Sequence, residues 1–384
     1  MPDARCSRAS LTHACHIRCL ASRFPCGQPG CAWIGHGRCD AAAGLASTVN
    51  ILFCSVPFHP SIGGIETISA LLAERFHRAG HRVVLVTQSP STLAERDAFE
   101  VVRRPSAARL FGLVRQADVV FHNNISLRLG WPQLLLRRPW VVAHHTWIPR
   151  TGAAARLKRA VLRRAANIAI SDAVARSLPV PSDIVPNPYA DDVFACDGAE
   201  ARPGDLVFVG RLVSDKGVDR LVSALALLAE RGVHARLTIV GDGPEAAALR
   251  RQAADAGVDD RIAFTGWQVA GDLVGTLNRH RVLVVPSVWE EPFGLVALEG
   301  MACGCVPLVT RSGGLPDAVG EGGLVVERDD PAALADGIER LLGDVALRDR
   351  YRARAAAHLA RHTPGRVADD YLKVISDACA AGAR

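Results

Sequence analysis

The sequence predicts an α/β protein made of two doubly wound halves. The chain has 384 residues, which is more than one hydrophobic core usually serves. Short apolar segments alternate with helical segments, and this alternation is typical of open parallel sheets. The alternation stops at residues 197–205 (DGAEARPGD), where Gly, Pro and small residues indicate a linker, and it then restarts. We therefore expect domains at residues 49–198 and 199–384.

The first half begins with a buried strand, NILFCSV, followed by a helix, IETISALLAERFHRAG. Ile65, Ile68, Leu72 and Phe76 recur along one side of this helix, and Gly80 ends it. Four more short apolar strands follow with helical segments between them: HRVVLVT, ADVVFHN, WVVAHH and NIAIS. This half therefore repeats strand and helix as a parallel sheet requires.

The second half follows the same plan. Two long helices, GVDRLVSALALLAERG and EAAALRRQAADAG, lie between its strands. The predicted strands are LVFVG, ARLTIVGDG, RIAFTG, RVLVVPS, VPLVT and GGLVVE. A final helix near residues 365–381 has the length to pack on either half.

The segment before Val49 differs from the rest of the chain. It lacks strand or helix periodicity, and it holds six of the eleven cysteines: Cys6, Cys15, Cys19, Cys26, Cys31 and Cys39. These spacings do not match paired Cys-x-x-Cys zinc knuckles, although a zinc site is conceivable, and no continuous apolar core marks a signal peptide. We expect residues 1–48 to be disordered or a misannotated extension, with Val49 as the true start. The scattered remaining cysteines suit a reducing cytoplasm.

Charge and hydropathy exclude two classes of protein. The net charge of +6 is too small to indicate nucleic-acid binding, and no apolar run approaches the roughly 20 residues of a membrane-spanning helix. One basic stretch stands out, with Arg156, Lys158, Arg159, Arg163 and Arg164 in a helical segment. It is either a solvated helix face or a contact with an anionic membrane surface or a phosphorylated acceptor.

Two glycine turns follow strands and could admit phosphate groups to backbone N–H donors. Gly63 and Gly64 lie in PSIGGIE and open a helix, and Gly241 and Gly243 lie in VGDGPE after a strand of the second half. The first turn lacks the G-x-G-x-x-G pattern of dinucleotide-binding dehydrogenases, and a plain turn is the alternative for it.

Basic side chains also follow a strand, in FVGRLVSDKG. Arg211 and Lys216 are expected above the sheet, where they could bind a diphosphate. Only three of the 45 basic residues are lysines, so a lysine at position 216 indicates that a compact ammonium is required there. A solvated loop cation is the alternative.

The stretch EEPFGLVALEG places two carboxylates around an uncharged segment. Glu291 is expected in a loop, and Glu299 about two turns into the following helix, so the two cannot form a matched pair on one helix face. They are expected to bind different parts of one long ligand. A carboxylate suits a ribose diol, and the helix N-terminus between them, at Phe293, Gly294 and Leu295, favours phosphate.

EPFGLVALE resembles the Glu-x7-Glu motif of retaining GT-B glycosyltransferases of the glycosyl transferase group 1 type. The resemblance extends over nearly the whole chain from Val49, and its motifs occur in order: GGIE, ISDAV, VPNPYADDVF, VGRLVSDKG, VGDGPE and SGGLPDAV. It implies two Rossmann-like domains facing a central cleft, with residues 49–198 on the acceptor side and residues 199–384 binding the nucleotide sugar. The chain departs from the family at Asp317, where Glu is usual, and at Pro188, where Gly is common.

The resemblance implies a role for each candidate residue. Glu291 would contact the hydroxyls of the donor sugar, and Glu299 would bind the nucleotide ribose. Arg211 and Lys216 would neutralise the leaving diphosphate, and Gly63 and Gly64 would form the glycine loop after the first strand. A family histidine that contacts the donor sugar corresponds to His144 or His145 in WVVAHHTW, and we favour His145 at the strand end.

The expected function is transfer of a hexose, with retention, from a UDP- or GDP-sugar to a glycan or lipid-linked acceptor in cell-envelope or exopolysaccharide biosynthesis. We expect no cofactor and no metal, because the chain contains no Asp-x-Asp motif. The expected location is cytoplasmic, with peripheral contact to anionic membrane and no nucleic-acid partner. A sugar-nucleotide epimerase on the same fold, or a catalytically inactive binding subunit, is the alternative.

Overall fold

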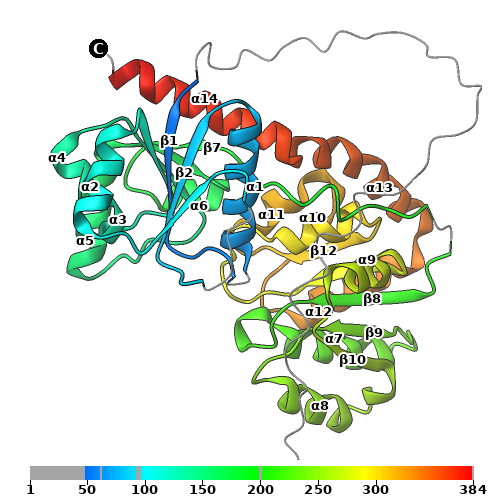
Figure 1. Cartoon of the computed structure of the whole chain (residues 1–384). Coiled ribbons are helices and arrows are strands. Elements are labelled where there is room, and N and C mark those ends of the chain that lie inside the picture. Colours follow the sequence, from blue (N-terminus) through cyan, green and yellow to red (C-terminus); the bar gives the residue numbers. More distant parts are fainter. Residues whose placement is uncertain (1–47, 61–62, 92–96, 199–200, 383–384) are drawn as a thin grey trace, which may run out of the picture. The chain divides into compact units, whose positions relative to one another are not determined.

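The structure is a computed structural model that describes residues 48–60, 63–91, 97–198 and 201–382. Two parallel sheets, each flanked by helices, form the described part (Figure 1). The cysteine-rich segment 1–48, for which we expected disorder or misannotation, lies outside the described residues except for its last residue.

The first sheet has seven parallel strands in the order β3-β2-β1-β4-β5-β6-β7. The strands are β1 Asn50–Ser55, β2 Arg82–Thr87, β3 Glu100–Arg103, β4 Val119–Asn123, β5 Trp140–His144, β6 Ala166–Ala169 and β7 Asp183–Ile184. The direction of winding reverses between β1 and β4, and ligands of open α/β sheets bind beyond the carboxyl ends of the strands at such a point.

The second sheet has six parallel strands in the order β10-β9-β8-β11-β12-β13. The strands are β8 Gly204–Val209, β9 Leu237–Val240, β10 Ile262–Gly266, β11 His280–Val285, β12 Val306–Thr310 and β13 Leu324–Val326. Here the winding reverses between β8 and β11. The two predicted doubly wound sheets are therefore confirmed.

Helices cover both faces of each sheet (Figure 1). Those of the first half are α1 Gly64–Arg78, α2 Ala107–Gln116, α3 Leu127–Gly130, α4 Gln133–Leu136, α5 Ala153–Val161 and α6 Asp172–Ser177. The later ones are α7 Val218–Glu230, α8 Ala246–Asp255, α9 Ala270–Asn278, α10 Leu295–Ala302, α11 Leu315–Val319, α12 Pro331–Gly343, α13 Val345–Leu359 and α14 Pro364–Gly382. Within the described ranges, no helix is long and apolar enough to cross a membrane.

The final helix, α14, packs on the first sheet although it follows the second sheet in sequence. Its residues Val367, Tyr371 and Ile375 are fully buried and share one core with Phe53 and Phe121 of β1 and β4. The Tyr371 and Phe121 rings meet edge to face at 5.8 Å. Figure 1 shows α14, in red, running along the first half, so the end of the chain connects the two halves.

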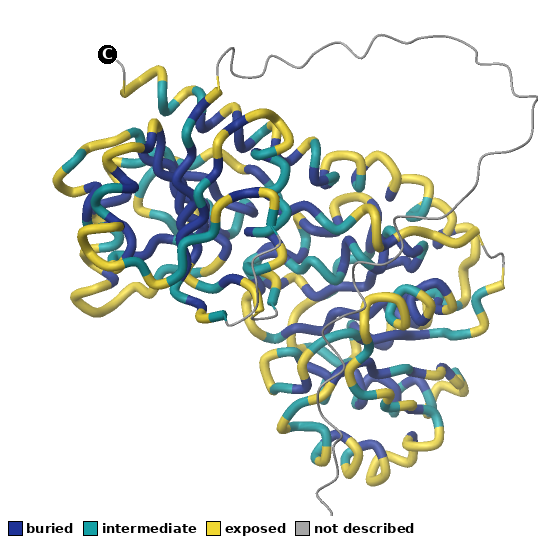
Figure 2. Tube along the Cα trace, viewed as in Figure 1, coloured by how far each residue is buried: buried dark blue, intermediate teal, exposed yellow. Residues whose placement is uncertain are grey.

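Sequence patterning located the long buried strands but not two short ones. β3 (Glu100–Arg103) is only half-buried and β7 (Asp183–Ile184) is exposed, so neither has an apolar run to mark it. The linker expected at residues 197–205 is shorter than its composition suggested, because β8 already begins at Gly204. Figure 2 shows that the central strands are buried and the connecting loops are exposed. This burial explains why the long strands are apolar runs in the sequence.

Candidate active site

A cavity of about 430 Å³ lies beyond the carboxyl ends of strands from both sheets. Of the twelve candidate residues, eight line it: Gly64, His145, Arg211, Lys216, Glu291, Phe293, Gly294 and Leu295. The other four, Gly63, Gly241, Gly243 and Glu299, do not contribute to its wall. Most of the candidate residues therefore line one cavity, although they come from segments more than 200 residues apart.

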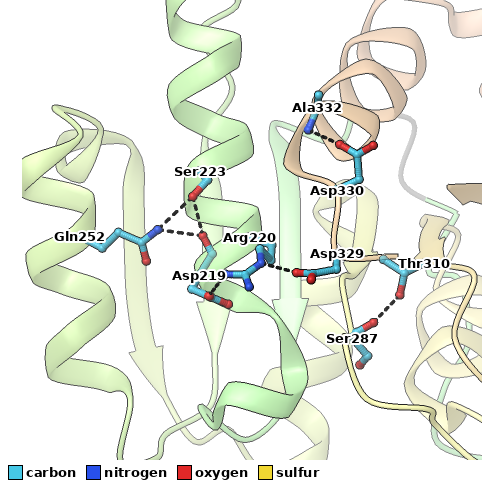
Figure 3. A network of polar contacts seen from close by, with 9 residues as sticks. All are labelled: Asp219, Arg220, Ser223, Gln252, Ser287, Thr310, Asp329, Asp330 and Ala332. Atoms are coloured by element: carbon cyan, nitrogen blue, oxygen red, sulfur yellow. Dashed lines mark hydrogen bonds and ion pairs between the residues drawn. The ribbon is translucent and has the colours of Figure 1, made fainter. Parts of the chain in front are cut away.

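Lys216 and Glu291 form an ion pair at the centre of this wall. The Lys216 ammonium donates to Glu291 Oε1, and the buried Ser287 hydroxyl donates to the same oxygen at 2.8 Å. Thr310 in turn donates its hydroxyl to the Ser287 carbonyl at 2.7 Å (Figure 3). Glu291 is only 8% exposed, and this chain of contacts holds its carboxylate in one position.

Both members of the pair keep hydrogen-bonding capacity. An ammonium has three N–H donors, and among the described residues Lys216 uses its side chain only for Glu291. Glu291 Oε2 accepts no hydrogen bond from the described part of the chain, because Lys216 and Ser287 both bind Oε1. The pair can therefore donate to an anion and accept from a hydroxyl at the same time.

The loop that carries Glu291 is fixed by close backbone contacts. Gly314 donates its N–H to the Glu291 carbonyl at 2.7 Å. A Cβ at Gly313, which has a φ of +55°, would lie 2.0 Å from that carbonyl oxygen, so only glycine fits. The SGGLPDAV segment therefore packs against the backbone of Glu291 and fixes the position of this residue. Its sequence alone did not suggest that role.

Arg211 follows β8 and is exposed at the edge of the cavity. Its side chain makes no hydrogen bond or ion pair with any residue that the structure describes. The glycine turn at Gly241 and Gly243 lies behind the Arg211 loop: a Cβ at these positions would lie 1.9 Å from the Gly210 carbonyl oxygen and 2.3 Å from that of Leu212. These two glycines therefore allow close backbone packing and do not themselves face the cavity.

His145 lies in the wall, just after β5, and is almost fully buried. Among the described residues, neither of its ring nitrogens meets the geometric criteria for a hydrogen bond, and the buried Oδ1 of Asn187, which also lines the cavity, has no partner either. Burial, together with the neighbouring His144, lowers the pKa of His145 to about 3, and the Asn187 side chain opposes the shift. His145 is therefore a neutral imidazole with unused donor and acceptor capacity.

His144, the other histidine considered, is held elsewhere. Its Nε2 meets Asn167 Oδ1 at 3.1 Å, and it does not line the cavity. Burial lowers its pKa to about 4. His144 therefore fixes two neighbouring strands, whereas His145 faces the site.

Glu299 lies in the second turn of α10, earlier in the helix than expected, because α10 begins at Leu295. It is half-buried, and its carboxyl makes no hydrogen bond or ion pair with any described residue. Desolvation raises the pKa of Glu299 to about 7. Residues four apart share one helix face, so Glu299 lies on the same side of α10 as Leu295, which does line the cavity.

Two helix N-termini meet at the cavity. Gly64 begins α1 and Leu295 begins α10, and a Cβ at Gly64 would lie 3.5 Å from the Leu295 side chain. Gly294, with a φ of +119°, turns the chain into α10. Helix N-termini carry positive partial charge and free N–H donors, so this corner is suited to phosphate. Gly63 caps α1 from outside the wall.

The wall residues that the sequence did not predict include Trp267, Ser287 and Asn187. Trp267 is 63% exposed, which is unusual for so large an aromatic side chain. It lies at the end of β10 in a segment that reads as an ordinary strand and turn. The one available signal was its position after the carboxyl end of a parallel strand.

Contacts between the two halves involve the motifs that carry the family resemblance. Ser171 Oγ donates to the Pro292 carbonyl at 2.7 Å, and the Asp172 N–H donates to Asp317 Oδ2 at 2.7 Å. Trp147 Nε1 donates to the Glu290 carbonyl at 2.8 Å. Asp317 replaces the Glu that is usual in the family, and its shorter side chain still reaches the first half.

Among the described residues, no group of three or more His, Cys, Asp and Glu side chains is arranged to hold a metal ion. The positive groups in the wall are Arg211, Lys216 and the helix N-termini described above.

Solved structures share this fold. HepE of Anabaena, in complex with UDP, matches with a TM-score of 0.74 and 19% identity over 85% of this chain and 100% of that one. Sucrose-phosphate synthase of Thermosynechococcus elongatus matches with a TM-score of 0.69 and 23% identity over 87% and 100%. The two parallel-sheet domains are therefore a GT-B fold, as expected.

The family matches agree with the fold. Residues 197–358 match glycosyl transferases group 1, and residues 62–180 match glycosyltransferase family 4. Each half of the chain thus matches a glycosyltransferase family, and the two matches together with the fold support a GT-B glycosyltransferase.

Curated relatives include D-inositol 3-phosphate glycosyltransferases. That of Corynebacterium efficiens is 36% identical over 184 residues, which cover 46% of this chain and 43% of the relative. That of Acidothermus cellulolyticus is 42% identical over 187 residues, which cover 46% and 41%. The chain therefore matches less than half the length of each of these relatives.

Proposed function

We propose that the protein transfers a hexose from a nucleotide-sugar donor to a sugar-containing acceptor, with retention of configuration and without a metal ion. One observation carries the proposal: a single cavity brings together the Lys216–Glu291 pair, the unpaired Arg211 and two helix N-termini. The complexes of HepE with UDP and with UDP-glucose support a uridine donor, although they concern that protein.

The positive groups fit the diphosphate of such a donor. Negative charge grows on the diphosphate as its bond to the sugar breaks, and preorganised cations stabilise that charge. Lys216 has two unused N–H donors, and Arg211 has its whole guanidinium free among the described residues. These groups do the work that a metal ion performs in enzymes with an Asp-x-Asp motif.

The transferred sugar fits between Glu291 and His145. Glu291 Oε2 can accept from sugar hydroxyls, and the neutral His145 can donate to one hydroxyl and accept from another. Burying polar groups without a partner is unfavourable, so a ligand that satisfies His145 and Asn187 gains free energy on binding. These two residues form the part of the site that selects a polyhydroxylated ring.

The nucleoside fits on the far side of the diphosphate. Glu299 lies one helical turn beyond Leu295 of the wall, and its carboxyl, unpaired among the described residues, suits a ribose diol. Trp267 offers an exposed ring on which a nucleobase can stack.

The retaining outcome rests on the resemblance of the Glu291–Glu299 segment to the Glu-x7-Glu motif. Lys216 and Ser287 hold Glu291 through Oε1, and we assign Oε2 to the hydroxyls of the donor sugar, so neither oxygen is assigned as a nucleophile. We therefore propose a front-face step, in which the acceptor hydroxyl attacks on the side from which the diphosphate leaves.

The test starts with thermal shift in UDP-, GDP- and ADP-glucose, because a bound donor stabilises the native state. The stabilising donor is then incubated without an acceptor, and NMR identifies the first anomer that slow hydrolysis releases. The α-anomer from an α-linked donor, unchanged by EDTA, is the expected result. Release of the β-anomer contradicts retention, loss of activity in EDTA contradicts metal independence, and no stabilisation by any sugar nucleotide overturns the proposal.

A sugar-nucleotide epimerase is the second candidate, because the diphosphate and sugar contacts would serve it equally. An epimerised nucleotide sugar among the products would favour it. The basic helix α5 leads us to propose further that the enzyme acts at an anionic membrane face on glycan or lipid-linked acceptors of the cell envelope.

A further inference from the structure

A second cavity, of about 410 Å³, opens at the carboxyl edge of the first sheet. Its wall includes Gln88 after β2, Arg104 after β3, Leu110 of α2, Arg128 of α3 and Trp131. No residue of this wall belongs to the donor cavity. It is therefore a separate pocket on the same edge of the sheet from which His145 extends.

Arg104 is held in place with most of its donors unused. Its backbone has a φ of +46°, the left-handed region that side chains rarely adopt, and its N–H donates to the Thr87 carbonyl at 2.8 Å. Its Nε–H donates to the Gln88 carbonyl at 3.0 Å. Among the described residues, the four terminal N–H groups of this exposed guanidinium have no acceptor.

Arg128 supplies a second unpaired guanidinium to the same cavity. It is exposed, and it forms no hydrogen bond or ion pair with the described part of the chain. Among the described residues of the wall none is acidic, and Ala107, the first residue of α2, brings a helix N-terminus to it. Positive charge from these three sources favours an anionic ligand, and guanidinium groups suit phosphate.

The rest of the wall is apolar. Trp131 is half-buried and stacks on Phe111 with ring centroids 6.2 Å apart, so its ring is fixed. Leu110 is buried beside it. A sugar ring has apolar C–H faces that pack on such surfaces, which a free inorganic ion cannot use.

Hydrogen bonds connect the walls of the two cavities. Asn124 Oδ1 accepts the N–H of His145 at 2.8 Å, and Arg128 lies four residues beyond Asn124, in α3. On the other side, the Gln88 N–H donates to the Val56 carbonyl at 3.1 Å, in the loop that leads to α1. The loops after β1 and β4 therefore link the two cavities by contacts between their neighbours.

We propose that this pocket is the acceptor subsite and that it binds a phosphorylated sugar, with Arg104 and Arg128 on the phosphate and Trp131 against the ring. The inference rests on the proposed transferase function. In the reaction, an acceptor hydroxyl oxygen bonds to the anomeric carbon while the bond from that carbon to the donor phosphate oxygen breaks. The hydroxyl proton leaves with the nucleoside diphosphate.

Calorimetry of the full chain saturated with UDP tests the proposal with three probes: glucose 6-phosphate, glucose and inorganic phosphate. We expect glucose 6-phosphate to bind most tightly. Arg104→Gln and Arg128→Gln should each weaken it about tenfold, since each removes a charge-assisted contact. Arg115→Gln, an exposed arginine at the far end of α2, is the matched control and should change nothing.

Trp131→Leu should weaken glucose 6-phosphate more than inorganic phosphate. Equal affinity for the two phosphates in the parent would reduce the pocket to an anion site and overturn the proposal, as would binding unaffected by either arginine variant. Stabilisation by UDP should persist in every variant. Loss of UDP binding by the parent itself would instead count against the donor site.

Discussion

The Lys216 ammonium and the Ser287 hydroxyl both donate to one oxygen of Glu291, so a buried carboxylate is anchored on one side and open on the other. Lys216 and Glu291 had been assigned to different parts of the donor. Their direct contact means that neither can be removed without changing the other. Their roles in binding and in catalysis are therefore coupled.

This coupling predicts a compensating pair of variants. Lys216→Ala should lower kcat by ~10²–10³, because it removes a preorganised cation from the leaving diphosphate. It should also lower the free energy of unfolding by about 1–3 kcal/mol, because the Glu291 charge stays buried without its partner. Adding Glu291→Gln should recover stability but not kcat, as urea unfolding and steady-state kinetics would show.

Lys373→Ala, an exposed lysine of α14, is the control for this pair. Strictly additive effects of the two substitutions on stability would mean that the ion pair does not form in solution. Parent-like turnover by Lys216→Ala would remove this residue from the mechanism.

How much the sequence could predict depends on how local each signal is. The strands that carry His145, Arg211 and Glu291 are apolar runs, so their order and the residues at their carboxyl ends followed from periodicity. Contact of Lys216 with Glu291 could not follow, because 75 residues separate them and the loop geometry of both decides it.

Gly241 and Gly243 show the converse limit. A glycine turn after a strand has the same sequence whether a phosphate or another segment of backbone packs against it. In this structure the Gly210–Leu212 loop packs against the turn. Trp267 was missed because exposure of an aromatic side chain is a tertiary property. The sequence predicted that the site lies at the carboxyl ends of the strands. Which side chains face the cavity depends on tertiary packing.

His145 should act as a neutral group at every working pH. Because burial lowers its pKa to about 3, its charge does not change above about pH 5, and it should add no limb to the pH profile of kcat/KM there. His145→Ala should lower kcat/KM about tenfold through loss of a hydrogen bond, and His145→Gln should restore part of it.

The shape of that profile separates this role from acid–base catalysis. If His145→Ala abolishes a limb with a midpoint between pH 6 and 8 (~6.5 being the ordinary value for histidine), then His145 is a proton carrier and the assignment is wrong. His144→Ala, which does not touch the cavity, should mainly lower Tm.

Trp267→Ala should raise the donor KM about tenfold or more while kcat stays unchanged, because stacking on a base contributes ~1–3 kcal/mol and is present before and during the reaction. Trp267→Phe should keep most of the affinity. Val269→Ala is the matched control, since Val269 is 65% exposed on the same loop but does not line the cavity. An unchanged KM for Trp267→Ala would place the base elsewhere.

The basic helix α5 should bind anionic vesicles. Arg156 and Arg163 are exposed, Leu157 beside them is 48% exposed, and the helix holds no acidic residue. Each basic group near such a surface contributes about 1 kcal/mol, screened by salt. We expect co-sedimentation with phosphatidylglycerol vesicles at low salt, lost at high salt and in Arg156→Gln/Arg163→Gln.

The control for that surface is Arg236→Gln/Arg350→Gln, which removes the same charge from exposed positions of the second half. Equal recovery with neutral vesicles, or an equal loss in the control, would leave α5 as a solvated helix face.

Glu299 predicts a pH dependence with a definite sign. Its pKa is raised to about 7 in the folded chain, above the ordinary glutamate value, so the folded state holds a proton that the unfolded state releases. Its contribution to the free energy of unfolding is therefore largest below about pH 4.5 and falls as the pH rises towards 7. Glu299→Gln should remove this slope from the pH dependence of urea unfolding.

Donor binding should show the opposite trend, because ribose hydroxyls donate to the ionised carboxylate and favour it. The Kd for UDP-glucose, whose diphosphate has no group titrating near neutrality, should rise by up to about tenfold per pH unit below 7, the limiting slope for one proton. Glu299→Gln should bind more weakly at pH 8 and lose the slope, whereas Glu290→Gln, an exposed neighbour of the site, should keep it. Calorimetry in buffers of different ionisation enthalpy would count the proton released on binding near pH 6.5. If the parent releases none, or if Glu299→Gln retains the parent's slope, then Glu299 does not bind the ribose.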